Sequence, residues 1–218
     1  MPFFSICSSI VSEGRLAETL ASMALAEPDF GPRIGVLSRR FYQCVAQPHV
    51  IWAITQWQSE KHHHDAAQSL MKSRRDDRIA AIRFGPEPYF EIFCDEDTGL
   101  QVGGPSTPCD CIIIAHGLVG ESVRTEYLRL QRQRIGQPTL HTRWMRVYRN
   151  RYQAAEFVAL LGLRNQREYQ DSRETDGLLA EEWLLTGLRK PLGMSYLASY
   201  NQFICAPLAL AEPLATTR

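Results

Sequence analysis

The sequence predicts an α+β fold built from two consecutive copies of one unit with the element order βαββαβ. The first observation behind this prediction is an internal repeat. The segment 40–57 aligns with the segment 147–164, so that Trp57 meets Arg164 at a spacing of 107 residues (164 − 57 = 107). The second observation is an aromatic, strand-like segment near the end of each copy, at 89–94 and at 200–205.

The third observation is the turn-rich stretch 97–108, which contains three glycines and two prolines and separates the two copies. We therefore expect a first unit at 1–96, a linker at 97–110 and a second unit at 111–218.

The first copy has a strand or helix pattern over most of its length. The expected elements are a strand at 3–10, a helix that carries Leu16, Leu20 and Met23 on one face, strands at 35–45 and 49–57, a helix capped by Ser59, and a strand at 89–94. The two middle strands form a hairpin. The run 50–54 is apolar at every position, which is typical of a strand that is covered on both faces.

The second copy repeats this order. The expected elements are a strand at 111–118, a helix that contains Leu128, strands at 142–152 and 156–163, a second helix, and a strand at 200–205. This is the order of a ferredoxin-like unit, whose sheet carries its helices on one face. Because the other face needs cover, we expect the two antiparallel sheets to pack into an intramolecular α+β barrel with pseudo-two-fold symmetry.

Composition excludes several classes of protein. The 24 basic and 24 acidic side chains give a net charge of zero, which argues against binding nucleic acid through its phosphates, and 44% hydrophobic residues argue against a disordered chain. No apolar run approaches the roughly 20 residues of a membrane helix, so we expect no membrane partner. The start of the chain lacks the pattern of a targeting segment, and six scattered cysteines predict reduced thiols in a cytoplasmic protein.

Three consecutive histidines, His62, His63 and His64, follow the expected helix cap. Neighbouring helix residues point about 100° apart, so the three imidazoles cannot bind one metal ion, and no other metal-binding pattern is present. Only His63 shares the apolar face with Ala66, where it could act as a general base near neutral pH. The alternative is a solvated first turn with one partly buried imidazole.

The strand expected at 142–152 carries four arginines. Period-two alternation places Arg146 on the same face as Trp144 and Tyr148, a strip that could hold a planar anionic or phenolic ligand. At the spacing of 107 residues, Arg39 in the first copy matches Arg146 (146 − 39 = 107). The alternative is an edge strand whose arginines pair with carboxylates.

His116 ends an apolar run in the first strand of the second copy. It could bind a ligand, and the alternative is a histidine near the core whose hydrogen bonds are satisfied within the protein.

The segment 54–63, which reads Ile-Thr-Gln-Trp-Gln-Ser-Glu-Lys-His-His, resembles the strand-to-helix junction of the dimeric α+β barrel superfamily, and of its antibiotic biosynthesis monooxygenase type in particular. In that type a strand ends in a Trp and a small capping residue and an acidic helix start follow, as Trp57, Ser59 and Glu60 do here. The resemblance implies that Trp57 lines a cleft between sheet and helices. The superfamily includes cofactor-independent oxygenases of aromatic polyketides, haem-degrading monooxygenases and isomerases.

Haem-degrading members of the superfamily carry an Asn on the first strand and an axial His in the second helix. The matching positions here are Ser9 and His116 on the two first strands, and Gln68 in the helix. An amide does not bind haem iron, so the resemblance implies a protein without a cofactor, with haem as the lower-ranked alternative.

Three functions follow as hypotheses. The first is a cofactor-independent monooxygenase or related oxidoreductase that acts on a small aromatic or phenolic substrate, with His63 as the base, Trp57 as the wall, and Arg39 or Tyr42 as the group that stabilises charge. The second is a non-catalytic barrel that binds a small molecule or serves as a structural module. The third is tetrapyrrole binding. The assembly is expected to be a monomer or a homodimer through the helical faces.

Overall fold

A computed structural model describes residues 3–12, 14–26, 32–73, 90–95, 101–102, 109–121, 124–125, 127–129, 132, 142–165, 167 and 197–209. The chain divides into two compact units, one made of Met1–Cys94 with Leu208–Arg218 and the other of Asp95–Pro207. In the described part of the chain, no helix has the length and apolar character that crossing a membrane requires.

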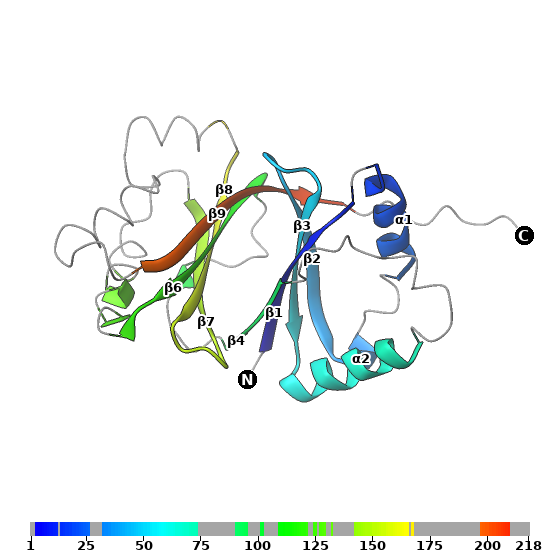
Figure 1. Ribbon diagram of the computed structural model, residues 1–218, viewed down its shortest axis with the longest axis horizontal. Coiled ribbons are helices and arrows are strands. Elements are labelled where there is room, and N and C mark those ends of the chain that lie inside the picture. Colours follow the sequence, from blue (N-terminus) through cyan, green and yellow to red (C-terminus); the bar gives the residue numbers. More distant parts are fainter. Residues whose placement is uncertain are drawn as a thin grey trace, which may run out of the picture. The chain divides into compact units, whose positions relative to one another are not determined.

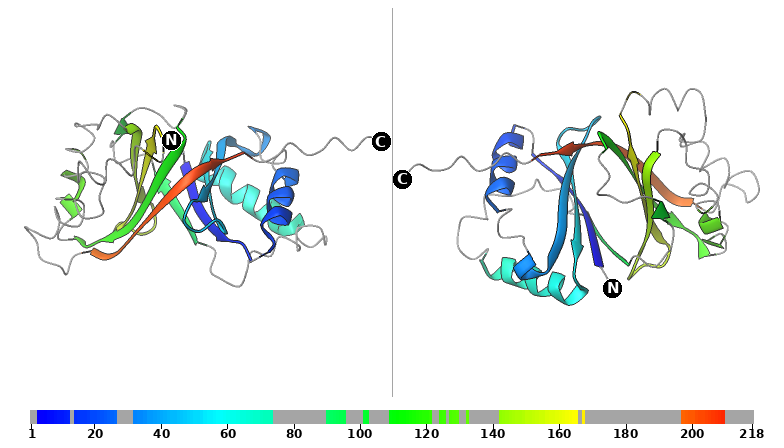
Figure 2. Two further views of the ribbon diagram at one scale, coloured as in Figure 1. Left: turned by 90° about the horizontal axis from the view of Figure 1, so that it is seen from above. Right: turned by 180° about the vertical axis from the view of Figure 1, so that it is seen from behind.

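The first unit has the predicted order βαββαβ (Figure 1). Its elements are β1 (Phe3–Ile10), α1 (Leu16–Ala26), a short 3₁₀ helix η2 (Pro32–Ile34), β2 (Val36–Cys44), β3 (Val50–Trp57), α2 (Glu60–Ser73) and β4 (Phe90–Asp95). The strands lie in the order β4-β1-β3-β2, and β3 pairs antiparallel with both β1 and β2. Both helices cover the same face of this sheet, as the views in Figure 2 also show.

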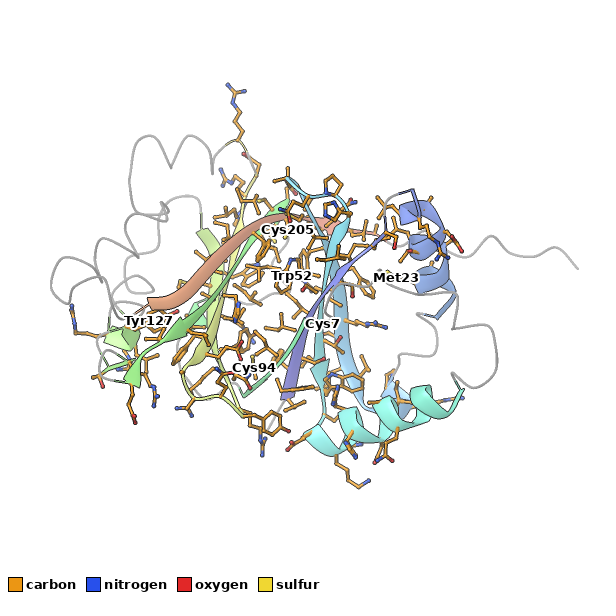
Figure 3. The ribbon with its side chains drawn as sticks, viewed as in Figure 1. Cys7, Met23, Trp52, Cys94, Tyr127 and Cys205 are labelled. Carbon is orange, nitrogen blue, oxygen red and sulfur yellow. The ribbon has the colours of Figure 1, made fainter. Side chains whose placement is uncertain are left out.

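Each helix of the first unit packs on its own group of apolar side chains. Under α1 the buried residues are Val11, Phe41, Ile51 and Ala53, with Cys7, Leu16, Leu20, Met23 and Leu208 packed against them (Figure 3). Under α2 they are Phe3, Val36, Trp57 and Ala66, with Ile34 and Phe93 packed against them. Because a sheet side chain points to the opposite face from its neighbours, Phe4, Ile6 and Trp52 face away from the helices.

The second unit contains β5 (Gln101–Val102), β6 (Cys111–Val119), β7 (Thr142–Asn150), β8 (Glu156–Leu163) and β9 (Leu197–Leu208) in the sheet order β9-β6-β8-β7-β5. Between β6 and β7 the described residues 124–125, 127–129 and 132 are helical. Tyr127 from this segment packs against Phe157, with ring centroids 5.1 Å apart. The second helix expected in this unit lies outside the described residues.

Two details of the second unit differ from the sequence-based expectation. The strand β5 lies within the stretch expected as a linker, and it pairs with β7. The strand β7 ends at Asn150 instead of Tyr152, because the Asn150 side-chain oxygen accepts the Tyr152 amide at 2.9 Å and so starts the turn. Tyr152 is consequently 65% exposed and does not extend the strip of Trp144 and Tyr148.

The alignment of the two copies at one constant spacing is wrong by one residue. Phe3 pairs with Trp57 in the first unit, and Cys111 pairs with Leu163 in the second, so Leu163 rather than Arg164 is the counterpart of Trp57. Both units also have a register irregularity one step along the hairpin, after Val36 and after Thr142. The loops between strands differ in length between copies, which shifts the spacing from strand to strand.

A shift of one residue moves a side chain to the other face of the sheet. Arg39 pairs with Thr55, and its counterpart is Met145, which pairs with Leu161; Arg146 is therefore not equivalent to Arg39. On the first strand, His116 pairs with Val158 as Ser8 pairs with Trp52, so Ser9 and His116 are not equivalent either.

Gly162 leaves space for the indole of its neighbour on β7. Trp144 pairs with Gly162 and is fully buried, and a Cβ at Gly162 would lie 2.1 Å from Trp144 Nε1. We expect Gly162→Ala to lower the free energy of unfolding by about 1–3 kcal/mol through overpacking, measured by urea denaturation. Trp144→Phe removes the obstructing atoms, so the double variant should lose less than the sum of the two single variants. Strict additivity would contradict the contact.

All six cysteines are free thiols, and burial raises the pKa of Cys111 from its ordinary 9.0 to about 11. The folded chain thus keeps the proton at pH values where the unfolded chain loses it. We expect this group to leave the stability unchanged below about pH 9 and to lower it as the pH rises from 9 to 11.

The same shift predicts slow alkylation of Cys111 in the native protein at pH 8, where roughly one thiol in a thousand is ionised. Iodoacetamide followed by peptide mass spectrometry should modify the half-buried Cys109 first. Equal labelling of the two cysteines in the folded protein would contradict the burial of Cys111.

Candidate functional site

An imidazole surrounded by aromatic rings lies under α2 in the first unit. The ring centroid of His63 lies 4.9 Å from Phe93, 5.1 Å from Trp57 and 5.8 Å from Phe3. Trp57 and Phe93 meet it edge to face, and Phe3 stacks on Phe93 at 5.8 Å. These four residues, which we call the His63 cluster, come from β1, β3, α2 and β4. The structure thus brings together His63 and Trp57, as the sequence predicted, and adds Phe3 and Phe93.

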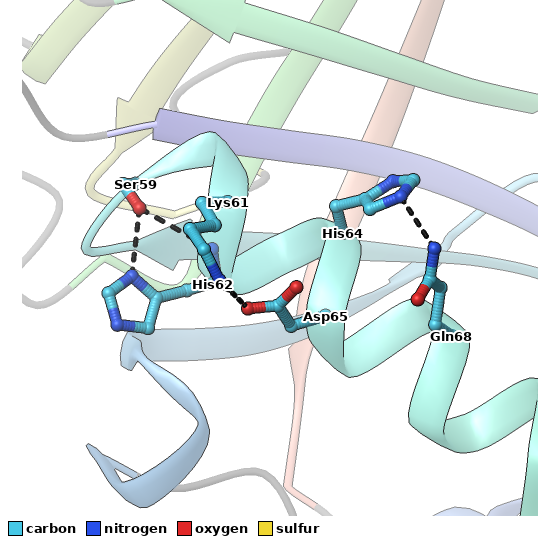
Figure 4. Close-up of polar contacts among 6 residues, drawn as sticks. All are labelled: Ser59, Lys61, His62, His64, Asp65 and Gln68. Carbon is cyan, nitrogen blue, oxygen red and sulfur yellow. Dashed lines mark hydrogen bonds and ion pairs between the residues drawn. The ribbon is translucent and has the colours of Figure 1, made fainter.

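Polar contacts fix the first turn of α2, which carries the three histidines; Figure 4 shows those of Ser59, His62 and His64. Ser59 caps the helix: its Oγ accepts the His62 amide at 3.4 Å and lies 2.8 Å from His62 Nδ1, and its carbonyl accepts the His63 amide at 3.3 Å. His64 points elsewhere, with Nε2 2.8 Å from the Gln68 amide. The three histidines therefore have three different surroundings, as their spacing on a helix predicts.

A glycine before β2 supports the first turn of α2. Gly35 has a φ of 86°, its amide donates to the Pro32 carbonyl at 3.0 Å, and its carbonyl accepts the Gln58 amide at 2.8 Å. A Cβ at this position would lie 2.4 Å from the Cβ of His62. The absence of a side chain at Gly35 therefore lets the helix start close to the hairpin strand.

The indole of Trp57 is held by a buried hydrogen bond. Trp57 Nε1 donates to Ser5 Oγ at 3.0 Å, and the two residues are 4% and 3% exposed. A buried indole N–H without an acceptor would cost about 1–3 kcal/mol, so Ser5 both stabilises the ring and fixes its orientation toward His63.

Arg39 lies on the same face as the His63 cluster. It pairs with Thr55, which lies two residues before Trp57 on β3, and its guanidinium carbon is 4.7 Å from the centre of the Phe41 ring. Phe41 packs under α1, so Arg39 faces the helices. The stacked guanidinium places a cation on a mostly apolar face.

The other predicted ligand contacts face away from the helices. Tyr42 lies on the opposite face of β2 from Phe41, next to Trp52. Trp144, Arg146 and Tyr148 alternate with Met145 and Val147, which pack on the helical side of the second unit. The structure therefore keeps Trp144, Arg146 and Tyr148 on one face of the second unit, as predicted, and within the first unit it places Tyr42 on the opposite face of the sheet from the His63 cluster.

His116 belongs to a buried polar network. Its Nε2 lies 2.7 Å from Glu156 Oε1, the Asn150 amide donates to Glu156 Oε2, and Asn150 also accepts the Tyr152 amide. Glu156 and Asn150 are buried, and a buried carboxylate requires such partners. The geometry is that of a histidine whose hydrogen bonds are satisfied within the protein, one of the two interpretations that the sequence left open. Sequence reasoning missed Glu156, although an acidic residue that starts an otherwise apolar strand was a usable signal.

The two positions that the sequence compares with haem ligands, Gln68 and His116, both make hydrogen bonds within the protein. Gln68 is exposed and bonded to His64, and His116 Nε2 is engaged by Glu156. Within the described residues, no three side chains of His, Cys, Asp or Glu gather as a metal site would require.

The second unit lacks the His63 cluster at the positions that the structure describes. The counterparts of Phe3 and Trp57 are Cys111 and Leu163. The counterpart of Ser5 is Ile113, which pairs with Leu161 as Ser5 pairs with Thr55. At these described positions, the second unit has a thiol and aliphatic side chains where the first has Phe3, Trp57 and Ser5.

No protein-family model and no curated protein sequence matches this chain. Solved structures do. A protein of Lactobacillus acidophilus NCFM assigned as a monooxygenase is 10% identical, with 97% of this chain and 96% of that chain covered and a TM-score of 0.62. An anthrone oxidase-like protein is 12% identical, with coverages of 100% and 97% and a TM-score of 0.65. A chlorite dismutase variant from Candidatus Nitrospira defluvii is 9% identical, with coverages of 97% and 93% and a TM-score of 0.59.

These similarities confirm the predicted fold class. The chain has an α+β fold with two ferredoxin-like units in one polypeptide, and the likeness extends over nearly the whole length of each neighbour. At these identities the likeness concerns the fold, and the argument for a function depends on the residues of the site.

The contact between Gly35 and His62 can be tested with a matched pair of glycine variants. Gly14 has a similar φ of 78° but open space around its Cβ position, whereas Gly35 faces His62. We expect Gly14→Ala to cost about 1 kcal/mol from backbone strain alone and Gly35→Ala to cost about 2 kcal/mol or more. Urea denaturation measures both. Equal losses in the free energy of unfolding would show that the His62 side chain moves away from the new methyl group without an energetic penalty.

Proposed function

We propose that the protein is a cofactor-independent, monooxygenase-type enzyme that acts on a small aromatic or phenolic substrate at the helix-facing side of its first unit. The observation that carries the proposal is the His63 cluster, an imidazole fixed between Trp57, Phe93 and Phe3 of the first unit. Aromatic walls favour a flat, apolar ligand, and an imidazole nitrogen can accept a proton as a general base. The structural neighbours assigned as a monooxygenase and as an anthrone oxidase-like protein support the reaction class.

In this proposal His63 accepts the proton of a substrate hydroxyl or of an acidic ring carbon. The resulting anion gives its electron pair to dioxygen, the co-substrate, and a C–O bond forms as a hydroperoxide after protonation. The remaining C–H bond then supplies the second electron pair, which forms the C=O bond as the O–O bond breaks. For a ring methylene, one oxygen atom replaces the two hydrogens as a carbonyl and the other oxygen leaves with these hydrogens as water. Trp57 and Phe93 hold the ring and exclude water, while Arg39 stabilises the negative charge.

A second function is favoured by the same contacts. Because His63 meets rings on three sides, the cluster could serve packing alone, in a barrel that binds a small molecule without reacting with it. The two functions differ in oxygen consumption.

The test measures oxygen uptake with anthrone and with simple phenols as substrates. We expect His63→Ala to lower kcat by roughly 100-fold or more, which is the usual contribution of a general base. His64→Ala, an exposed histidine on the same helix, is the matched control and should retain full activity. Unfolding curves verify that both variants fold.

Unchanged turnover in His63→Ala would reject His63 as the base. Binding of these compounds without any oxygen uptake by the unmodified protein would establish the non-catalytic function instead.

A further inference from the structure

A row of three polar residues crosses the sheet of the first unit between the two helix-covered groups of apolar side chains. Thr55 on the central strand β3 pairs with Ser5 on β1 and with Arg39 on β2. On one side of this row lie Phe3 and Trp57, under α2, and on the other lie Cys7, Ala53 and Phe41, under α1. We call Ser5, Thr55 and Arg39 the polar row.

Burying the polar row would destabilise the fold if these three side chains served packing alone. Ser5 is 3% and Thr55 is 4% exposed, and a buried hydroxyl is less favourable than an apolar group of the same size unless it makes hydrogen bonds. The Ser5 hydroxyl accepts one hydrogen bond, from the Trp57 indole N–H. The half-buried Arg39 brings a guanidinium onto the same face, stacked on Phe41.

The second unit shows that the fold does not require polar residues here. The same row in that unit is Ile113, Leu161 and Met145, with Leu161 paired to both neighbours, and all three are buried core residues. The register, the strand order and the helix-facing side are equivalent in the two units. The strand order and register therefore do not require Thr55 and Arg39 to be polar, whereas Ser5 satisfies the Trp57 indole.

We propose that the polar row is a subsite for the charged oxygen of the ligand, which makes the preferred ligand the phenolate form of a planar aromatic compound. This inference rests on the proposed function, since it names the form of substrate that the same face binds. The aromatic body lies against the His63 cluster, and its oxyanion meets the Arg39 guanidinium and the Thr55 hydroxyl. A guanidinium supplies several N–H donors in one plane, and charge-assisted hydrogen bonds are strong where water is excluded.

Ser5 has a different part in this subsite. Because its oxygen accepts the Trp57 indole N–H, it positions the ring that the ligand stacks on, and it couples the polar row to the His63 cluster. Ser5 is thus a positioning residue.

The experiment compares two probes of similar shape, 4-nitrophenol above the pH at which it ionises and 4-nitroanisole, which carries no ionisable hydroxyl. Calorimetric titration of the full chain gives the ratio of their affinities. We expect the unmodified protein to prefer 4-nitrophenolate, and Arg39→Met, which introduces the residue of the second unit, to reduce that preference on the order of tenfold or more. Arg40→Met is the matched control, because Arg40 follows on the same strand and faces the opposite side.

A pair of variants at Thr55 separates the hydroxyl from packing. Thr55→Val keeps the shape and should weaken 4-nitrophenolate binding several-fold while 4-nitroanisole binding is unchanged, and Thr55→Ser should retain the preference. Absorbance of the bound 4-nitrophenol against pH gives a second readout, since a cationic subsite lowers the pKa of the bound phenol.

An unchanged preference in Arg39→Met, equal loss of both probes, or an unmodified protein that prefers 4-nitroanisole would each overturn the inference. These results are distinct from failure of the proposed function. A phenolate preference that depends on Arg39 without oxygen uptake leaves the subsite intact and rejects the reaction, whereas oxygen uptake that is indifferent to Arg39 does the reverse.

Discussion

The antiparallel pairing of β3 with β1 on one side and β2 on the other determines the rest of the site. Side chains alternate between the two faces of a sheet, so this register decides which residues face the helices. Once Trp57 is paired with Phe3, Thr55 must face the helices beside Ser5 and Arg39, and Tyr42 must face away. The cap at Ser59 and the absence of a side chain at Gly35 then place α2 so that His63 contacts Phe3 and Trp57.

The sequence was sufficient to predict the element order, because that order depends on local periodicity. The helix that carries Leu16, Leu20 and Met23, the strand that ends at Trp57 and the cap at Ser59 all form as expected. The equivalence of the two copies was predicted one residue out of register. Two copies with little identity allow several alignments, and only strand pairing shows that Leu163, not Arg164, replaces Trp57. In a sheet, an error of one residue assigns every side chain of the strand to the opposite face.

The candidate site was predictable to the same extent. His63 and Trp57 lie close together in the chain, so the helix face and the strand end were enough to associate them. Phe3 and Phe93 come from strands distant in sequence, and their approach to His63 depends on sheet order rather than on any local pattern. The network of His116 with Glu156 was hidden for the same reason, because the two residues meet across a strand pair and are 40 positions apart.

The two units have the same strand order but different side chains in the middle of the helix-facing side. The second fills the middle of its helix-facing side with Ile113, Leu161 and Met145, which contribute hydrophobic burial, and the first places hydroxyls and a guanidinium there. Joining both in one polypeptide has a numerical consequence. The polar row occurs in one of the two described sheets, so the proposed subsite predicts one bound ligand per chain rather than one per unit.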